Sequence, residues 1–159
     1  MNVRPRIVAL FLLVLTFVSC NAPVDLYVGP YRLVTTKPDA KNLVGKWIID
    51  STTIKDLQTN GYKLPEPTTI VLHPDETFSL VNMPDLYKSD ADTNRQFVSL
   101  AGKWSLQNEY GHWSIALSAS ERTPRLELWE PRYNSEPKYQ LRVLIGDPDS
   151  RHFIVFEKR

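Results

Sequence analysis

The sequence predicts an all-β fold, in which eight short antiparallel strands close into an up-and-down barrel after an N-terminal signal and a short tether. Apolar and polar residues alternate in short runs from residue 44 onward, and turn residues separate these runs. No stretch combines sustained helical spacing of apolar residues with a capping residue. Because closing eight antiparallel strands on themselves removes exposed edges, we expect a barrel.

Composition and charge restrict the class of protein. The chain has 159 residues, with 42% hydrophobic and 23% charged residues, which is typical of one globular domain and not of a disordered chain. The formal net charge of +1 argues against a nucleic-acid partner, since such proteins usually carry a strongly basic surface. A single cysteine excludes an internal disulfide, a thiolate zinc site and a CxxC redox pair.

Residues 1–19 have the pattern of a lipoprotein signal peptide. Arg4 and Arg6 precede an apolar run from Ile7 to Val18, which is short for a membrane span of about 20 residues. The run ends in Phe-Val-Ser-Cys20, which resembles the bacterial lipobox. That resemblance implies that Cys20 is lipidated and becomes the first residue of the mature chain. The alternatives are an ordinary signal peptide and an uncleaved anchor.

The expected location is the bacterial cell envelope, with the protein anchored in the membrane through its lipid. Asn21 follows the cysteine, and aspartate at that place often marks inner-membrane retention, so the outer membrane is favoured in a two-membrane cell. Removing residues 1–19 takes away two arginines and no acid, and the charge becomes −1. Residues 20–40, with Pro23, Pro30 and Pro38, are expected to form a loosely held lipidated tether.

The barrel domain is expected over residues 41–159. Turn residues join several of its strands, at 73–76, 108–111 and 146–149. Two longer loops, 52–67 and 83–95, have the length to fold over one mouth of a barrel, and the first has room for a short helix or a strand extension. The eight predicted strands cover residues 44–51, 68–72, 77–81, 97–107, 113–118, 125–130, 138–145 and 152–157.

One motif occurs twice: Leu-Val-Gly45-Lys-Trp47 returns as Leu-Ala-Gly102-Lys-Trp104. Together with the Asp-Glu-Thr-Phe turn that ends at Phe78, this order resembles the bacterial lipocalin-like domains. The resemblance covers about residues 41–159. It implies that the two glycines and two tryptophans close the barrel beside an arginine from a late strand. Arg142 and Arg159 are the possible arginines, and Arg142 is taken as the barrel-closing one.

Large apolar and aromatic side chains are the candidates for lining a ligand pocket, because such pockets are mostly apolar. Trp129 is a special case, since Leu126 and Leu128 fall on the opposite strand face. It therefore points outward as a contact patch, or it packs under the loop at 131–137. The candidate lining residues are Phe78, Trp113, Trp129, Tyr139 and Leu141.

Catalytic and metal chemistry is scarce in this sequence. His73, His112 and His152 lie at turns or strand edges with no metal-ligand spacing, and no common catalytic motif occurs. We therefore expect no enzyme activity, no metal and no cofactor. Two functions stay open: a barrel that binds a small apolar molecule, and a filled barrel whose loops contact an envelope protein, as inhibitor or immunity-type lipoproteins do.

Overall fold

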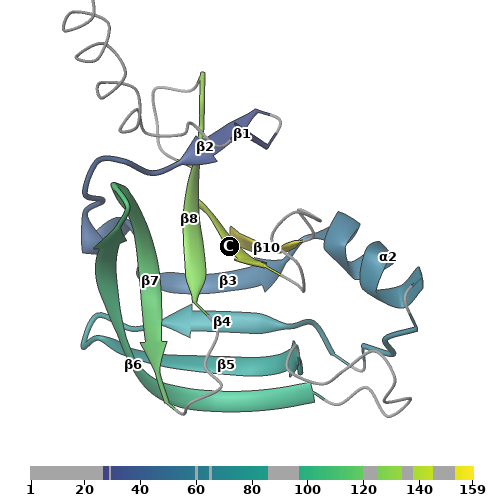
Figure 1. Cartoon of the computed structure of the whole chain (residues 1–159). Helices are drawn as coiled ribbons and strands as arrows, with labels where there is room; N and C mark the ends of the chain where they lie inside the picture. The colour runs from purple at the N-terminus through teal and green to yellow at the C-terminus, as the bar shows by residue number, and fades with distance from the viewer. Residues whose placement is uncertain are drawn as a thin grey trace, which may run out of the picture.

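The fold is a closed antiparallel β-barrel with one short helix (Figure 1). The computed structural model describes residues 27–28, 30–59, 61–64, 66–85, 97–119, 125–133, 138–144 and 153–159. The lipidation position Cys20, the turn at 146–149, His152 and most of the 83–95 loop lie outside the described residues.

Eight strands form the barrel wall, and each pairs with its sequence neighbour before β10 pairs back with β3. Their bounds differ from the predicted ones by at most three residues, so the predicted all-β barrel is confirmed. The architecture is compatible with the lipocalin-like fold that the resemblance implies. The strands are β3 (Gly45–Ile49), β4 (Thr69–Leu72), β5 (Thr77–Pro84), β6 (Phe97–Glu109), β7 (His112–Ser118), β8 (Leu126–Pro131), β9 (Gln140–Leu144) and β10 (Phe153–Lys158).

Alternation along each strand sends one set of side chains into the barrel and the other set outward. The inward set forms a single packed cluster, in which Trp47, Ile70, Phe156 and Leu128 are 0% exposed. An eight-stranded barrel has an interior that side chains can fill, and the large side chains here do so along the described strands. Burial of this cluster is the main source of stability.

Gly102 is where the long strand β6 changes partners. From Phe97 to Lys103 β6 pairs with β5, and from Lys103 to Glu109 it pairs with β7. A Cβ at Gly102 would lie 2.2 Å from the backbone oxygen of Ser118, which ends β7. Only glycine lets the two backbones approach so closely at this bend.

A short N-terminal hairpin, β1 (Tyr27–Val28) and β2 (Tyr31–Leu33), adds to the barrel beside the upper end of β8 (Figure 1). The expectation of a loosely held tether is therefore wrong for this part of residues 20–40. Leu33 pairs with Trp129 in the ladder, and the Val34 backbone N–H donates to the Leu128 carbonyl at 3.0 Å. The unsatisfied edge of β8 explains why a segment with no strand pattern of its own is ordered there.

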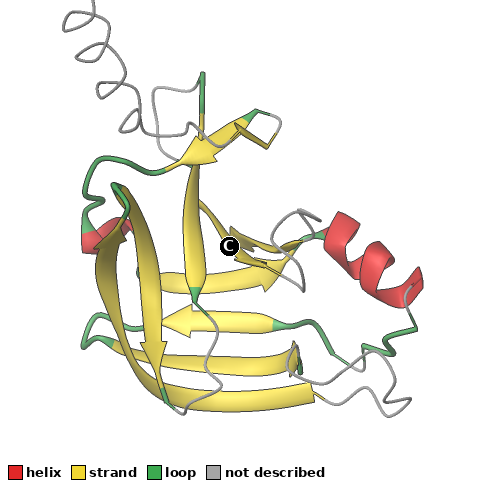
Figure 2. Ribbon diagram, in the orientation of Figure 1, coloured by secondary structure: helices red, strands yellow, loops and turns green. Residues whose placement is uncertain are grey.

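Two short helical segments sit at opposite ends of the wall (Figure 2). The 3₁₀ helix η1 (Ala40–Asn42) directly precedes β3, and the α-helix α2 (Ser51–Thr59) directly follows it. Helix α2 is the short helix for which the sequence left room in the 52–67 loop. We call the two ends of the barrel the η1 end and the α2 end.

Candidate functional site

The η1 end of the barrel is closed by side chains around Trp47. Leu43 is 0% exposed, and its carbonyl accepts a hydrogen bond from Trp47 Nε1–H at 2.9 Å. Trp104 is buried nearby and donates Nε1–H to the His73 carbonyl in the β4–β5 turn at 3.0 Å. Both tryptophans are therefore core side chains with their one polar atom satisfied, as expected.

The cation at this end is Lys158, and Arg142 does not lie there. Lys158 Nζ is 5.9 Å from the centroid of the Trp47 ring and donates to the Asn42 carbonyl at 2.8 Å. Gly45, with φ +134°, leaves room for it, because a Cβ there would lie 3.0 Å from Lys158 Cε. The choice of Arg142 as the barrel-closing residue is wrong. Strand pairing places Lys158 opposite Trp47. The resemblance implied only an arginine for this position.

The α2 end carries inward apolar side chains that are only half-buried. Val98 and Leu100 alternate with outward residues on β6, and both are half-buried against the core cluster. Opposite them on β5, Met83 and Leu80 are 1% exposed. Among the described residues, this first half of β6 pairs only with β5, because β7 ends at Ser118.

Helix α2 and the segment after it lie over this end. Leu57 is 4% exposed within the core cluster, and Ile54, Tyr62 and Leu64 are half-buried against the cluster. The Tyr62 ring meets the Phe97 ring edge-on, with centroids 6.3 Å apart. We name the half-buried apolar set at this end the α2 mouth; it consists of Ile54, Tyr62, Leu64, Val98 and Leu100.

Polar bonds hold the start of α2 against the last strand. Asp50 precedes the helix, and its carboxylate accepts the Thr53 backbone N–H at 2.7 Å, as an N-cap does. The Thr53 hydroxyl accepts the Val155 backbone N–H at 3.2 Å, and the Asp50 backbone N–H donates to the Val155 carbonyl at 2.9 Å. The first turn of the helix is therefore fixed to β10.

The predicted lining residues do not form one site. Phe78 and Leu141 are buried in the core at 2% and 0% exposure. Trp113 and Tyr139 are half-buried near the η1 end, where burial raises the pKa of Tyr139. Trp129 is also misplaced as a lining residue, because it packs on the outer face of the barrel.

That outer face holds a buried arginine among aromatic rings. Arg142 is 5% exposed, and its guanidinium carbon lies 4.5 Å from the Trp129 centroid, 5.1 Å from Tyr31 and 5.8 Å from Phe153. Its Nη2 donates to Gln140 Oε1 at 2.9 Å, while none of the described residues accepts a hydrogen bond from Nε. Burial lowers the pKa of Arg142 from its usual value, although an arginine stays charged at neutral pH. Trp129 is 1% exposed, so the expected outward contact patch at this residue is covered.

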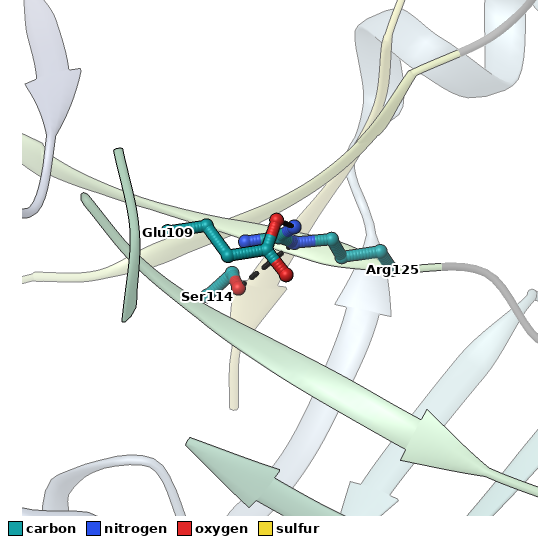
Figure 3. Close-up of polar contacts among 3 residues, drawn as sticks. All are labelled: Glu109, Ser114 and Arg125. Carbon is teal, nitrogen blue, oxygen red and sulfur yellow. Dashed lines mark hydrogen bonds and ion pairs between the residues drawn. The ribbon is translucent and has the colours of Figure 1, made fainter. Parts of the chain in front are cut away.

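A second polar cluster links the β6–β7 hairpin to β8 (Figure 3). Arg125 Nε donates to Ser114 Oγ at 2.9 Å, and its Nη1 forms an ion pair with Glu109. Both charged side chains are more than a third exposed, so the pair contributes little to stability. Ser114 Oγ thus accepts a hydrogen bond from a cationic side chain that is itself paired with a carboxylate.

The two described histidines lie at different turns. His73 is exposed in the β4–β5 turn, and His112 at the start of β7 is half-buried, with no hydrogen-bond partner for Nδ1 among the described residues. Within the described ranges, no group of three or more metal-ligating side chains is present. In that same part of the chain, no helix has the length and apolarity needed to cross a bilayer. Comparison with known proteins gives no match to a family, to a curated protein or to a solved structure.

Proposed function

We propose that this protein is a lipid-anchored envelope lipoprotein whose barrel binds a small apolar molecule at the α2 mouth. The fold is compatible with ligand binding, since eight-stranded barrels hold one small ligand or fill their interior with side chains. Here the interior is filled along the described strands, so the ligand would lie at the rim and not at the centre.

The observation that carries the proposal is the set of half-buried apolar side chains that the α2 end gathers around the first residues of β6. At the α2 end, Val98 and Leu100 face inward and stay half-buried, and the Tyr62 ring lies close by as a polar-tipped neighbour. Half-buried apolar side chains beside a hydroxyl match the lining of small-molecule sites.

The ligand site is tested with a matched pair of variants on one strand. Leu100→Gln places an amide in the α2 mouth, and Ala101→Gln places the same amide on the outward face of β6. An unpartnered buried amide costs about 1–3 kcal/mol, so affinity for the apolar probe N-phenyl-1-naphthylamine should fall by about tenfold or more in Leu100→Gln only. Probe fluorescence titration measures this, and near-UV circular dichroism checks that both variants are folded. Equal probe affinity in the two variants would remove the α2 mouth as the site.

The anchor is tested separately with Cys20→Ser. Two or more acyl chains bind a membrane firmly, at about 0.8 kcal/mol per buried CH₂. We expect the full-length protein to sediment with membranes and the serine variant to be released. A variant that stays in the membrane fraction would contradict the lipoprotein assignment.

The packed interior supports a second candidate, a protein-interaction module. A barrel whose interior is filled along the described strands leaves its loops and outer face as the contact surface. Native mass spectrometry of the protein purified from its own envelope separates the two functions. A co-purifying small molecule supports the binding barrel, and a co-purifying protein supports the interaction module.

A further inference from the structure

We infer that the N-terminal hairpin fixes the orientation of the barrel on the bilayer, with the η1 end against the lipid headgroups and the α2 mouth directed into the aqueous phase. This inference rests on the proposed lipid anchor. It adds a membrane-contacting surface, which consists of Tyr110, Arg132 and Tyr133.

The hairpin is held to the barrel by backbone bonds on both sides. The Trp113 backbone N–H of β7 donates to the Val34 carbonyl at 2.8 Å, and the Arg132 backbone N–H donates to the Pro30 carbonyl at 2.9 Å. With the Val34 bond to Leu128, residues 30–34 bridge β7 and β8 where these two strands no longer pair with each other. This segment is therefore part of the wall and not a free linker.

Side chains reinforce that connection from both faces. Tyr31 lies over the buried Arg142 guanidinium, and Arg32 forms an ion pair with Glu130 at 3.0 Å. Val34 is 1% exposed in the core cluster. Because one side chain enters the core and another covers a buried cation, the hairpin has one defined position on the barrel.

The chain between Cys20 and this hairpin is short. From Cys20 to Tyr27 there are seven residue steps, which span at most about 25 Å when fully extended. A lipid on Cys20 therefore keeps the hairpin within that distance of the bilayer surface. The hairpin lies beside the last residues of β8, and the strand ends nearby belong to the η1 end. These last residues of β8 are therefore the part of the barrel wall nearest the anchor, and we orient their end towards the membrane.

Two tyrosines project from that end. Tyr110, 95% exposed, occupies the β6–β7 turn, and Tyr133, 82% exposed, follows β8. Arg132 stacks on the Tyr133 ring with its guanidinium carbon 5.7 Å from the centroid. Tyrosine and arginine have apolar bodies with polar tips, the combination that is enriched at headgroup level.

The backbone of the turn supports a role for Tyr110. Its φ is +53° and that of Gly111 is +81°, the pair of positive values that a two-residue hairpin turn requires. Asparagine or glycine fits the first place without strain, whereas a bulky tyrosine is uncommon there. A strained backbone conformation at an exposed tyrosine supports a role for this side chain in contacting another surface.

The test uses the full-length lipidated protein in vesicles of phosphatidylethanolamine and phosphatidylglycerol that contain a nitroxide-labelled headgroup lipid. Tyr110→Cys and Tyr133→Cys are labelled with one thiol-reactive fluorophore, and Gln58→Cys on the exposed face of α2 is the matched control. We expect strong quenching at positions 110 and 133 and little at position 58. Equal quenching at all three positions, or stronger quenching at 58, would overturn the orientation.

Two further readouts separate this inference from the proposed anchor. If Cys20 of the parent chain reacts with the fluorophore and the protein does not float with the vesicles, both the lipid anchor and the orientation are contradicted. If the protein floats with the vesicles but the labels at 110 and 133 are not quenched, the anchor is supported and the orientation is contradicted. If the cysteines at 110 and 133 are shielded from the thiol-reactive fluorophore in native envelopes but not in vesicles, a protein partner covers them. That result would also overturn the membrane contact.

Discussion

Gly102→Ala tests whether the bend of β6 is set by close backbone approach. The added Cβ would lie 2.2 Å from the Ser118 oxygen, 3.0 Å from the Ser118 carbonyl carbon and 3.1 Å from Ala119 Cα. All three atoms are backbone, so no side chain can rotate away. The β6–β7 ladder must move at the position where the Lys103–Ser118 pair begins.

The size of the effect follows from these distances. An ordinary C···O approach is about 3.3 Å, so the backbone must shift by about 1 Å. Forcing one extra methyl group into a packed site costs about 1–3 kcal/mol, and a backbone obstruction belongs at the upper end of that range. Replacing glycine also restricts the unfolded chain, which offsets about 0.4–1 kcal/mol. We expect a net loss of about 2 kcal/mol, or roughly 6–8 °C in Tm for a domain of this size.

The assay is urea unfolding followed by tryptophan fluorescence, with Gly111→Ala as the control. Position 111 has open space around an added Cβ but a φ of +81°, so its substitution costs only backbone strain of about 1–2 kcal/mol. A Gly102→Ala variant as stable as the parent would refute the close-approach reasoning. A larger loss for Gly111→Ala would show that φ, and not the clash, determines which glycines this barrel needs.

Two other predictions concern the η1 end. Trp47→Ala should lower the free energy of unfolding by about 3–5 kcal/mol, because the ring is 0% exposed in the core, and an unchanged melting temperature would show that Trp47 is not a core residue. Hydrogen bonds from the Thr77 hydroxyl and backbone hold the pKa of Asp75 below its usual value, so the stabilisation is present above the unfolded pKa of about 3.9 and is lost as pH falls through the folded pKa. The stability difference between the parent and Asp75→Ala should therefore shrink in acid, and a difference that grows below pH ~4 would contradict this sign.

Much of the wall could be predicted from the sequence, because a half-buried strand records its two faces in every second residue. The alternation of Trp113, Ile115 and Leu117 with smaller or polar residues is a direct example, and the structure pairs this strand with β6 as a hairpin. The repeated Gly-x-Trp motif also predicted two core tryptophans for a local reason, since glycine admits the bend and the indole fills the space.

The hairpin at residues 27–34 could not be predicted in this way. Its strands are two and three residues long, too short for alternation to be visible. It is ordered by the free edge of β8, which exists only once β7 and β8 diverge. The burial of Trp129 follows from the same event, because Tyr31 and Arg142 cover a ring that the strand pattern directs outward.

The sequence by itself determined the fold class and the pairing of strands that follow one another, because alternation within each short segment records its buried face. Tertiary structure alone decided which cation lies over Trp47, which side chains cover Trp129 and where the N-terminal segment docks. These depend on strand register, by which Lys158 meets Trp47 and Arg142 meets Glu127 across separate strands. Register is a property of the closed sheet, and no spacing within a single segment encodes it.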